Sequence, residues 1–97
     1  MEVQRMKITL SDGYEVTLDD NVLDDWELLC GLVAVEKGED AALVPVSDRL
    51  LSPEEKTKLL EHLRGENGRV SILSMANCIG ELLNSAHKAK NSASSQA

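Results

Sequence analysis

Residues 22–37, VLDDWELLCGLVAVEK, show two apolar stripes when they are placed on a helix, whereas a surface helix needs only one. The first stripe has the i, i+4, i+7, i+8, i+11 spacing of a helix that faces a core, so we expect Trp26 to be mostly buried. The second stripe lies roughly opposite. This helix is therefore either the central helix of the domain, which is the preferred interpretation, or it presents one side to a partner. The first stripe comprises Val22, Trp26, Leu29, Cys30 and Val33, and the second comprises Leu28, Leu32 and Val35.

Both ends of this helix are marked by residues that commonly cap helices. N-cap candidates occur at residues 19–21, so Asp24 and Asp25 would lie in the first turn, where carboxylates meet the positive end of the helix dipole. Lys37 in the last turn and Gly38 just after it are typical of a helix end. The acidic cluster lacks the ligand spacing and central glycine of a calcium loop, so we predict no metal site there.

The segment before this helix is predicted to be an antiparallel β-hairpin over residues 4–18. Apolar and polar residues alternate through 6–10 and again through 14–18, which is the period of half-buried strands. The connection SDG at 11–13 ends in Gly13, which takes a positive φ without steric cost. Because a lone hairpin is marginally stable in water, its apolar face is expected to lie on helices.

Residues 39–51 carry a weaker helical pattern that is interrupted by Pro45. Proline is tolerated in the first turn of a helix and disruptive later. Two interpretations therefore stay open: a helix begins near Val44, or a looser turn from Glu39 leads into it.

The run SPEE at 52–55 predicts the start of another helix. It has serine at the N-cap, proline at N1 and glutamate at N3, as in a capping box. In that arrangement Ser52 and Glu55 each satisfy a backbone donor of the other. Leucines continue the pattern to Arg64, and Gly65 ends it.

A last helix is expected after Ser71, which resembles an N-cap, and it is apolar over a wide arc, with Leu73 off the main stripe. From residue 89 onward no large apolar side chain occurs, so residues 89–97 are predicted to be a disordered tail rich in serine and alanine. Residues 1–88 are predicted to form a single α+β domain, in which an N-terminal two-stranded β-hairpin packs on a bundle of three to four α-helices.

The charge of the chain favours protein partners over nucleic acids and membranes. The formal net charge is −7, and all 17 acidic side chains precede Leu83. A surface of this sign repels phosphate backbones and anionic lipids, so we expect no nucleic-acid and no membrane binding. No run of about 18 apolar residues and no leader-like segment is present, so a cytoplasmic protein is expected.

No group of residues has the pattern of a catalytic, cofactor or metal site. His62 and His87 lack partners at ligand spacing, and Cys30 and Cys78 are expected to be buried free thiols. A helix-turn-helix around residues 65–69 is disfavoured, because the candidate recognition helix has no basic residue before Lys88. We therefore predict a small acidic interaction protein that is not an enzyme and that holds no cofactor and no metal.

The order of several segments resembles small tail assembly chaperones encoded by tailed phages and prophages of Gram-positive bacteria. The similarity covers roughly residues 7–83 and is one of order and spacing, since no segment is a catalytic fingerprint. The segments are KITLSDGYEV at 7–16, LD at 18–19, DDWELL at 24–29, EEKTKL at 54–59 and ENGRV at 66–70.

The resemblance implies a function in the assembly of long phage tails. Such chaperones are thought to bind the tape measure protein and to keep its hydrophobic helices soluble until tail tube subunits polymerise around it. The implied partner is thus the tape measure protein, with the tail tube protein as a second candidate. The alternative is a generic acidic adaptor or inhibitor, such as an antitoxin or anti-repressor, with a strongly basic partner. The expected partner-binding residues are Leu28, Leu32, Val35, Leu73 and Leu83.

Overall fold

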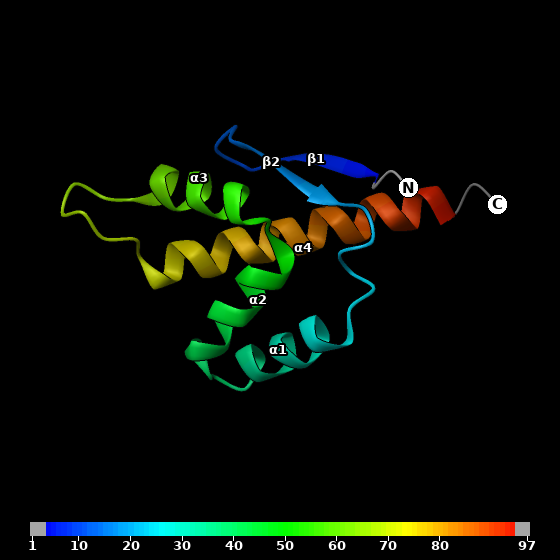
Figure 1. Ribbon diagram of the computed structural model, residues 1–97, viewed down its shortest axis with the longest axis horizontal. Helices are drawn as coiled ribbons and strands as arrows, with labels where there is room; N and C mark the ends of the chain where they lie inside the picture. Colours follow the sequence, from blue (N-terminus) through cyan, green and yellow to red (C-terminus); the bar gives the residue numbers. More distant parts are fainter. Residues whose placement is uncertain (1–3, 95–97) are drawn as a thin grey trace.

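The computed structural model describes residues 4–94, with side chains placed for residues 4–89. It confirms the predicted α+β fold, in which an antiparallel two-stranded hairpin precedes the helices (Figure 1). In chain order the elements are β1 (Arg5–Thr9), β2 (Glu15–Asp19), α1 (Trp26–Glu36), the 3₁₀ turn η1 (Asp40–Ala42), α2 (Leu43–Leu50), α3 (Pro53–Leu63) and α4 (Ile72–Ser94).

The hairpin forms as the alternating pattern predicts. β1 and β2 pair from Arg5 opposite Asp19 to Thr9 opposite Glu15. Gly13 closes the turn with a φ of +92°, a backbone conformation that residues with a Cβ rarely adopt. One face of the hairpin is buried, and its buried residues are Ile8, Leu10, Val16 and Leu18.

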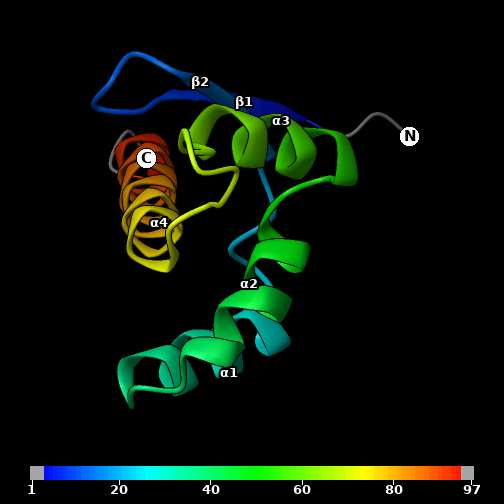
Figure 2. The ribbon, with the colours of Figure 1, turned by 90° about the vertical axis from the view of Figure 1, so that its left-hand side faces the viewer.

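Two helices cover this buried face. Figure 2 shows α3 and α4 beneath the hairpin, where α3 contacts β2 and α4 contacts β1. α4 is the longest helix and runs along most of the molecule (Figure 1). The core therefore lies between the hairpin, α3 and α4 and continues onto the inner sides of α1 and α2, and its helical members include Leu28, Val46, Leu50, Leu59, Ile79, Leu82 and Ala86.

α1 is not the central helix of the domain, so that interpretation of residues 22–37 is wrong. α1 packs on α2 and η1 and lies farthest from the hairpin (Figures 1 and 2). The two helices cross closely, because a Cβ on Gly31 would come within 2.6 Å of Cγ2 of Val46. α1 and α2 thus form an arm whose inner side joins the core, and α1 is covered on one side only.

α1 also begins later than the sequence pattern indicated. Its N-cap is Asp25, whose Oδ1 accepts hydrogen bonds from the backbone N–H groups of Glu27 (3.0 Å) and Leu28 (3.1 Å). Of residues 19–21, which we expected to cap the helix, Asp19 ends β2 and residues 20–21 belong to a turn, and Val22 precedes the helix although its side chain is buried. Asp25 caps the helix instead, because it directly precedes the first helical residue and its carboxylate accepts hydrogen bonds from two backbone N–H groups.

The region around Pro45 combines the two interpretations that the sequence left open. η1 starts at Asp40, as a looser turn from Glu39 would, and it leads directly into α2. Pro45 lies in the first turn of α2, where a backbone N–H group would have no acceptor within the helix, so proline removes no helical hydrogen bond.

The start of α3 confirms half of the predicted capping box. Ser52 Oγ accepts a hydrogen bond from the backbone N–H of Glu55 at 3.2 Å, and Pro53 occupies the first helical position. Glu55 does not return the bond to Ser52. Its Oε1 instead accepts the backbone N–H of Thr17 at 3.0 Å, so this carboxylate satisfies an outward-facing donor of β2 and ties α3 to the hairpin.

α4 continues to Ser94, past the point where we expected order to end. Residues 89–94, predicted as part of a disordered tail, are helical in the structure, while residues 95–97 lie outside the described part. A segment with no large apolar side chain can still be helical when it continues an existing helix. Once a helix exists, each further residue adds a hydrogen bond at small cost, and neither glycine nor proline interrupts this segment.

Candidate partner-binding surface

The structure reverses the inward and outward sides that we expected for α1. Leu28 is only 1% exposed and belongs to the core cluster, and Leu32 and Val35 are partly buried against it. These three residues, predicted to bind a partner, therefore form the packed side of the arm. Trp26, expected to be mostly buried, is 75% exposed. The physical reason is that α2 crosses α1 at Gly31, which lies on the same side of the helix as Leu28 and Val35.

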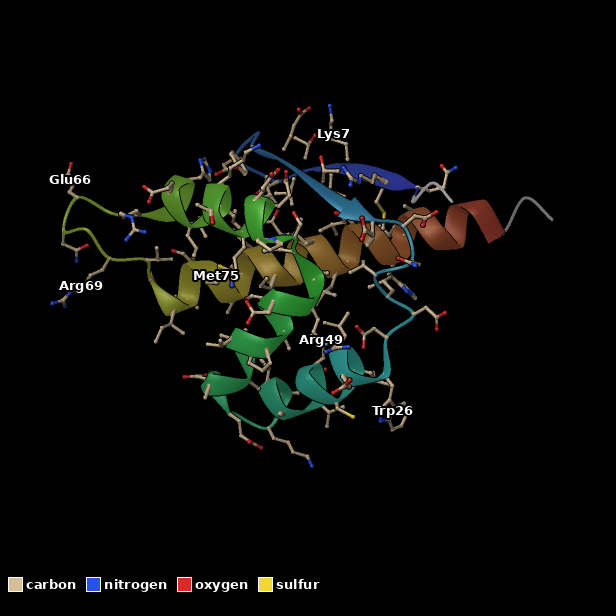
Figure 3. All side chains as sticks on the ribbon, viewed as in Figure 1. Lys7, Trp26, Arg49, Glu66, Arg69 and Met75 are labelled. Carbon is tan, nitrogen blue, oxygen red and sulfur yellow. The ribbon has the colours of Figure 1, made fainter. Side chains whose placement is uncertain are left out.

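The opposite side of α1 is an exposed apolar surface, which we call the α1 face. Leu29 and Val33 are 51% and 44% exposed, and Figure 3 shows Trp26 pointing away from the ribbon at the start of the helix. The residues follow the i, i+3, i+4, i+7 spacing of one helical stripe. Large apolar residues gathered on one exposed stripe are typical of a protein-binding site, whereas single ones are ordinary. The α1 face comprises Trp26, Leu29, Cys30 and Val33.

An open acidic hollow of about 1270 Å³ adjoins the α1 face. Its wall continues from Trp26 and Cys30 across Gly31 to α2, so the hollow and the stripe share two residues. Four carboxylates and one guanidinium border it. The residues that line this acidic hollow are Asp24, Asp25, Trp26, Glu27, Cys30, Gly31, Pro45, Asp48 and Arg49.

Arg49 of α2 organises the carboxylates of the hollow. Its Nε lies 2.9 Å and 3.1 Å from the two carboxylate oxygens of Asp25, and its terminal nitrogen lies 3.4 Å from Glu27. The hydrogen bond from Arg49, followed by the backbone N–H of Leu28, holds the pKa of Asp25 below its ordinary value. Asp48 pairs with Lys56, whereas the Asp24 carboxylate has no hydrogen bond or ion pair within the described residues. The hollow therefore keeps a negative balance after its internal pairs are formed.

A second apolar surface, the α2–α4 groove, lies where α2, α3 and the start of α4 meet. Its volume is about 420 Å³. Its apolar lining includes Val44 and Ile72, which are both well exposed, and the full lining is Asp40, Ala41, Leu43, Val44, Ser47, Asp48, Lys56, Leu60, Val70, Ser71, Ile72 and Met75.

The two remaining predicted partner-binding residues lie on α4 and differ in exposure. Leu73 is 69% exposed next to the α2–α4 groove, so it is accessible as expected. Leu83 is partly buried against the core and is not freely accessible. Of the five predicted residues, only Leu73 thus lies on an open surface, and it is far along the chain from the α1 face.

His62 is exposed, and it also anchors the tip of the hairpin. Its ring stacks on Tyr14 with the centroids 4.1 Å apart, and its Nε2 lies 2.7 Å from Oδ2 of Asp12. This contact lowers the pKa of Asp12. From the other side, Glu81 of α4 accepts hydrogen bonds from the backbone N–H (2.9 Å) and the hydroxyl (3.2 Å) of Ser11. The network joins the turn to α3 and α4.

The cysteines do not form a reactive or bridged pair. Both are free, as predicted, but Cys30 is exposed on the α1 face instead of buried. Cys78 is buried in the core, and burial raises the pKa of its thiol, so the thiol stays protonated.

Within 4–94, no three or more His, Cys, Asp or Glu side chains gather in a way that could hold a metal ion. No helix in the described part of the chain is long and apolar enough to cross a membrane.

Comparison of the chain with protein-family models, with curated proteins and with solved structures gave no match.

The exposed side of α1 is the feature that was predicted wrongly from the sequence. One signal could have found it: a glycine inside a helix often marks a close approach of another backbone or side chain, and Gly31 falls on the Leu28 side.

Proposed function

We propose that this protein is a phage tail assembly chaperone, which binds helices of the tape measure protein and keeps them soluble during tail assembly. The observation that carries the proposal is the α1 face, an uncovered apolar stripe on a helix of a strongly acidic protein. The resemblance of residues 7–83 to such chaperones supports the same function.

The proposal gives each part of the molecule a role. The hairpin, α3 and α4 supply most of the core, and the arm of α1 and α2 joins it with its inner side and presents the apolar stripe on its outer side. An apolar stripe can cover the apolar side of a client helix, while the net charge of −7 keeps the complex dispersed. The α2–α4 groove offers a second apolar contact, and the tail tube protein is the second candidate partner.

Co-expression tests the proposal. The chain is produced together with the tape measure protein of its own genome, and the soluble fraction of that partner is compared with its fraction at matched expression without the chain. We expect the soluble fraction to rise. No gain would contradict the chaperone function.

The salt dependence of the complex separates the proposal from the alternative of an acidic adaptor. Apolar contact should dominate the affinity, so the complex should survive a change from about 0.1 M to 1 M salt, which shortens the screening length from about 10 Å to 3 Å. An adaptor or inhibitor held to a basic partner by charge alone would release it at high salt.

A further inference from the structure

The α1 face and the acidic hollow are continuous, and together they show two kinds of chemistry on adjacent sides of one helix. The apolar stripe runs through Trp26, Leu29 and Val33, while the hollow begins at Trp26 and extends toward α2. Any helix that lies along the stripe brings one of its flanks over the hollow. The residues on that flank then meet carboxylates.

The hollow stays negatively charged, because its carboxylates outnumber the cationic side chains that pair with them. Arg49 forms ion pairs with Asp25 and Glu27, and Lys56 forms an ion pair with Asp48. The Asp24 carboxylate is left without such a partner among the side chains of residues 4–89. The exposed indole of Trp26 at the border of the hollow adds an aromatic face, which attracts Lys and Arg side chains.

We infer that the α1 face and the acidic hollow form one docking site for an amphipathic helix whose apolar stripe is bordered by Lys or Arg on the side that faces the hollow. The stripe supplies contact area, and the hollow fixes which flank of the client lies toward α2. This inference deepens the proposed function, since it states the chemistry of the client helix.

A second copy of the chain is a poorer occupant than a basic-flanked helix. Each copy carries a net charge of −7, and two α1 faces in contact would bring two acidic hollows near each other. Like charges on both sides of an interface oppose association. The free chain is therefore expected to be monomeric at this surface.

Synthetic peptides test the inference without the natural partner. Two 18-residue amphipathic helices share one leucine stripe and carry either lysine or glutamate on the flank beside it. Binding to the full chain is followed by the emission of Trp26, which is the only tryptophan. At about 0.1 M salt the lysine peptide should bind at least about 10-fold more tightly than the glutamate peptide and shift the emission to shorter wavelength, and the ratio should shrink at about 1 M.

A pair of variants with equal charge change shows whether the hollow causes this preference. Asp24→Lys alters the hollow, whereas Glu66→Lys alters the turn at the opposite end of the molecule (Figure 3). We expect D24K to weaken lysine-peptide binding about 5-fold and E66K to weaken it less than about 2-fold. Leu29→Ser should weaken both peptides alike, because it removes part of the shared stripe.

Three results would overturn the inference: equal binding of the two peptides, equal effects of D24K and E66K, or a dimer of the free chain that L29S disperses in sedimentation. These outcomes are distinct from failure of the proposed function. If the lysine peptide is preferred but the tape measure protein gains no solubility, the result supports the docking site and contradicts the chaperone function. If solubility rises but both peptides bind equally, the chaperone function stands and the docking site falls.

Discussion

Gly31 decides which side of α1 is buried, because only a residue without a Cβ allows α2 to approach so closely. A Cβ there would lie 2.6 Å from Cγ2 of Val46, well inside normal contact distance. The nearby apolar residues of α1 on that side, Leu28 and Val35, are thereby directed into the arm. The α1 face lies on the side of the helix opposite this close approach.

Gly31→Ala is expected to destabilise the protein. Overpacking against Val46 costs about 1–3 kcal/mol, and the lower entropy of alanine in the unfolded chain returns about 0.5–1 kcal/mol. Gly80→Ala is the matched control, since Gly80 lies in α4 and a Cβ there meets nothing within 4 Å. G80A should stabilise by about 0.5–1 kcal/mol. Urea unfolding measures both, and a G31A variant as stable as G80A would contradict the assigned crossing.

The residues that could be predicted from sequence are those whose role is local. Ser52 caps α3 and Gly13 closes the hairpin because the structure of the neighbouring backbone requires them. Trp26 and His62 could not be predicted, since their surroundings come from segments distant in the chain. Gly31 near Trp26 indicates that something approaches that side of α1 but does not identify α2 as the neighbour, and Tyr14 and His62 meet only when α3 docks on the hairpin.

At the scale of elements, Arg49 of α2 forms ion pairs with Asp25 and Glu27 at the start of α1, besides the apolar contact of the two helices. The Asp25 side chain therefore caps the N-terminus of one helix and binds the other. The arm therefore depends on the ionised form of Asp25.

This dependence predicts a loss of stability in acid. The folded-state pKa of Asp25 lies below its ordinary value of 3.8, so its contribution is fully present above that value and is lost as the pH falls below it. Asp25→Asn keeps an efficient N-cap but removes the charge. D25N should be less stable than the wild type at pH 7 and should lose less of its melting temperature between about pH 5 and pH 2.

Asp24→Asn serves as the control for this pH experiment, because the Asp24 carboxylate has no bonded partner within the described residues. D24N should keep the pH profile of the wild type. A D25N profile that coincides with the wild-type profile would show that the contact with Arg49 does not contribute to folding.

α4 has both core and surface positions. Leu73 is an exposed position, and Leu83 is a position that packs against the core. Leu73→Ser should change the free energy of unfolding by less than about 0.5 kcal/mol, because the side chain is exposed. Leu83→Ser should cost at least about 1 kcal/mol, because Leu83 packs against the core. Thermal unfolding compares the two. Equal effects would mean that α4 is rotated relative to the hairpin.

At this scale the sequence predicts the existence of elements better than their packing. The hairpin, the α3 cap and the start of α4 follow from alternation and capping residues, and all three are observed. The side of α1 that is buried does not follow, because residues 22–37 are apolar on two sides and periodicity alone cannot choose between them.

At the scale of the whole molecule, the hairpin, α3 and α4 surround most of the core, while the arm of α1 and α2 extends away from the hairpin and adds its inner side to that core (Figure 2). The large apolar residues left exposed lie on α1, on α2 and at the start of α4. This distribution suits a protein that folds through one part and binds through another. The account therefore predicts that binding and stability can be changed separately.

The double substitution Leu29→Ser and Val33→Ser tests this central claim most directly. Both side chains are exposed, so the melting temperature should stay close to that of the wild type. The soluble fraction of the co-expressed tape measure protein should fall toward the level seen without the chain, and the exposed control L73S should lower it less. A double variant that keeps its melting temperature and still solubilises the partner as the wild type does would contradict the account.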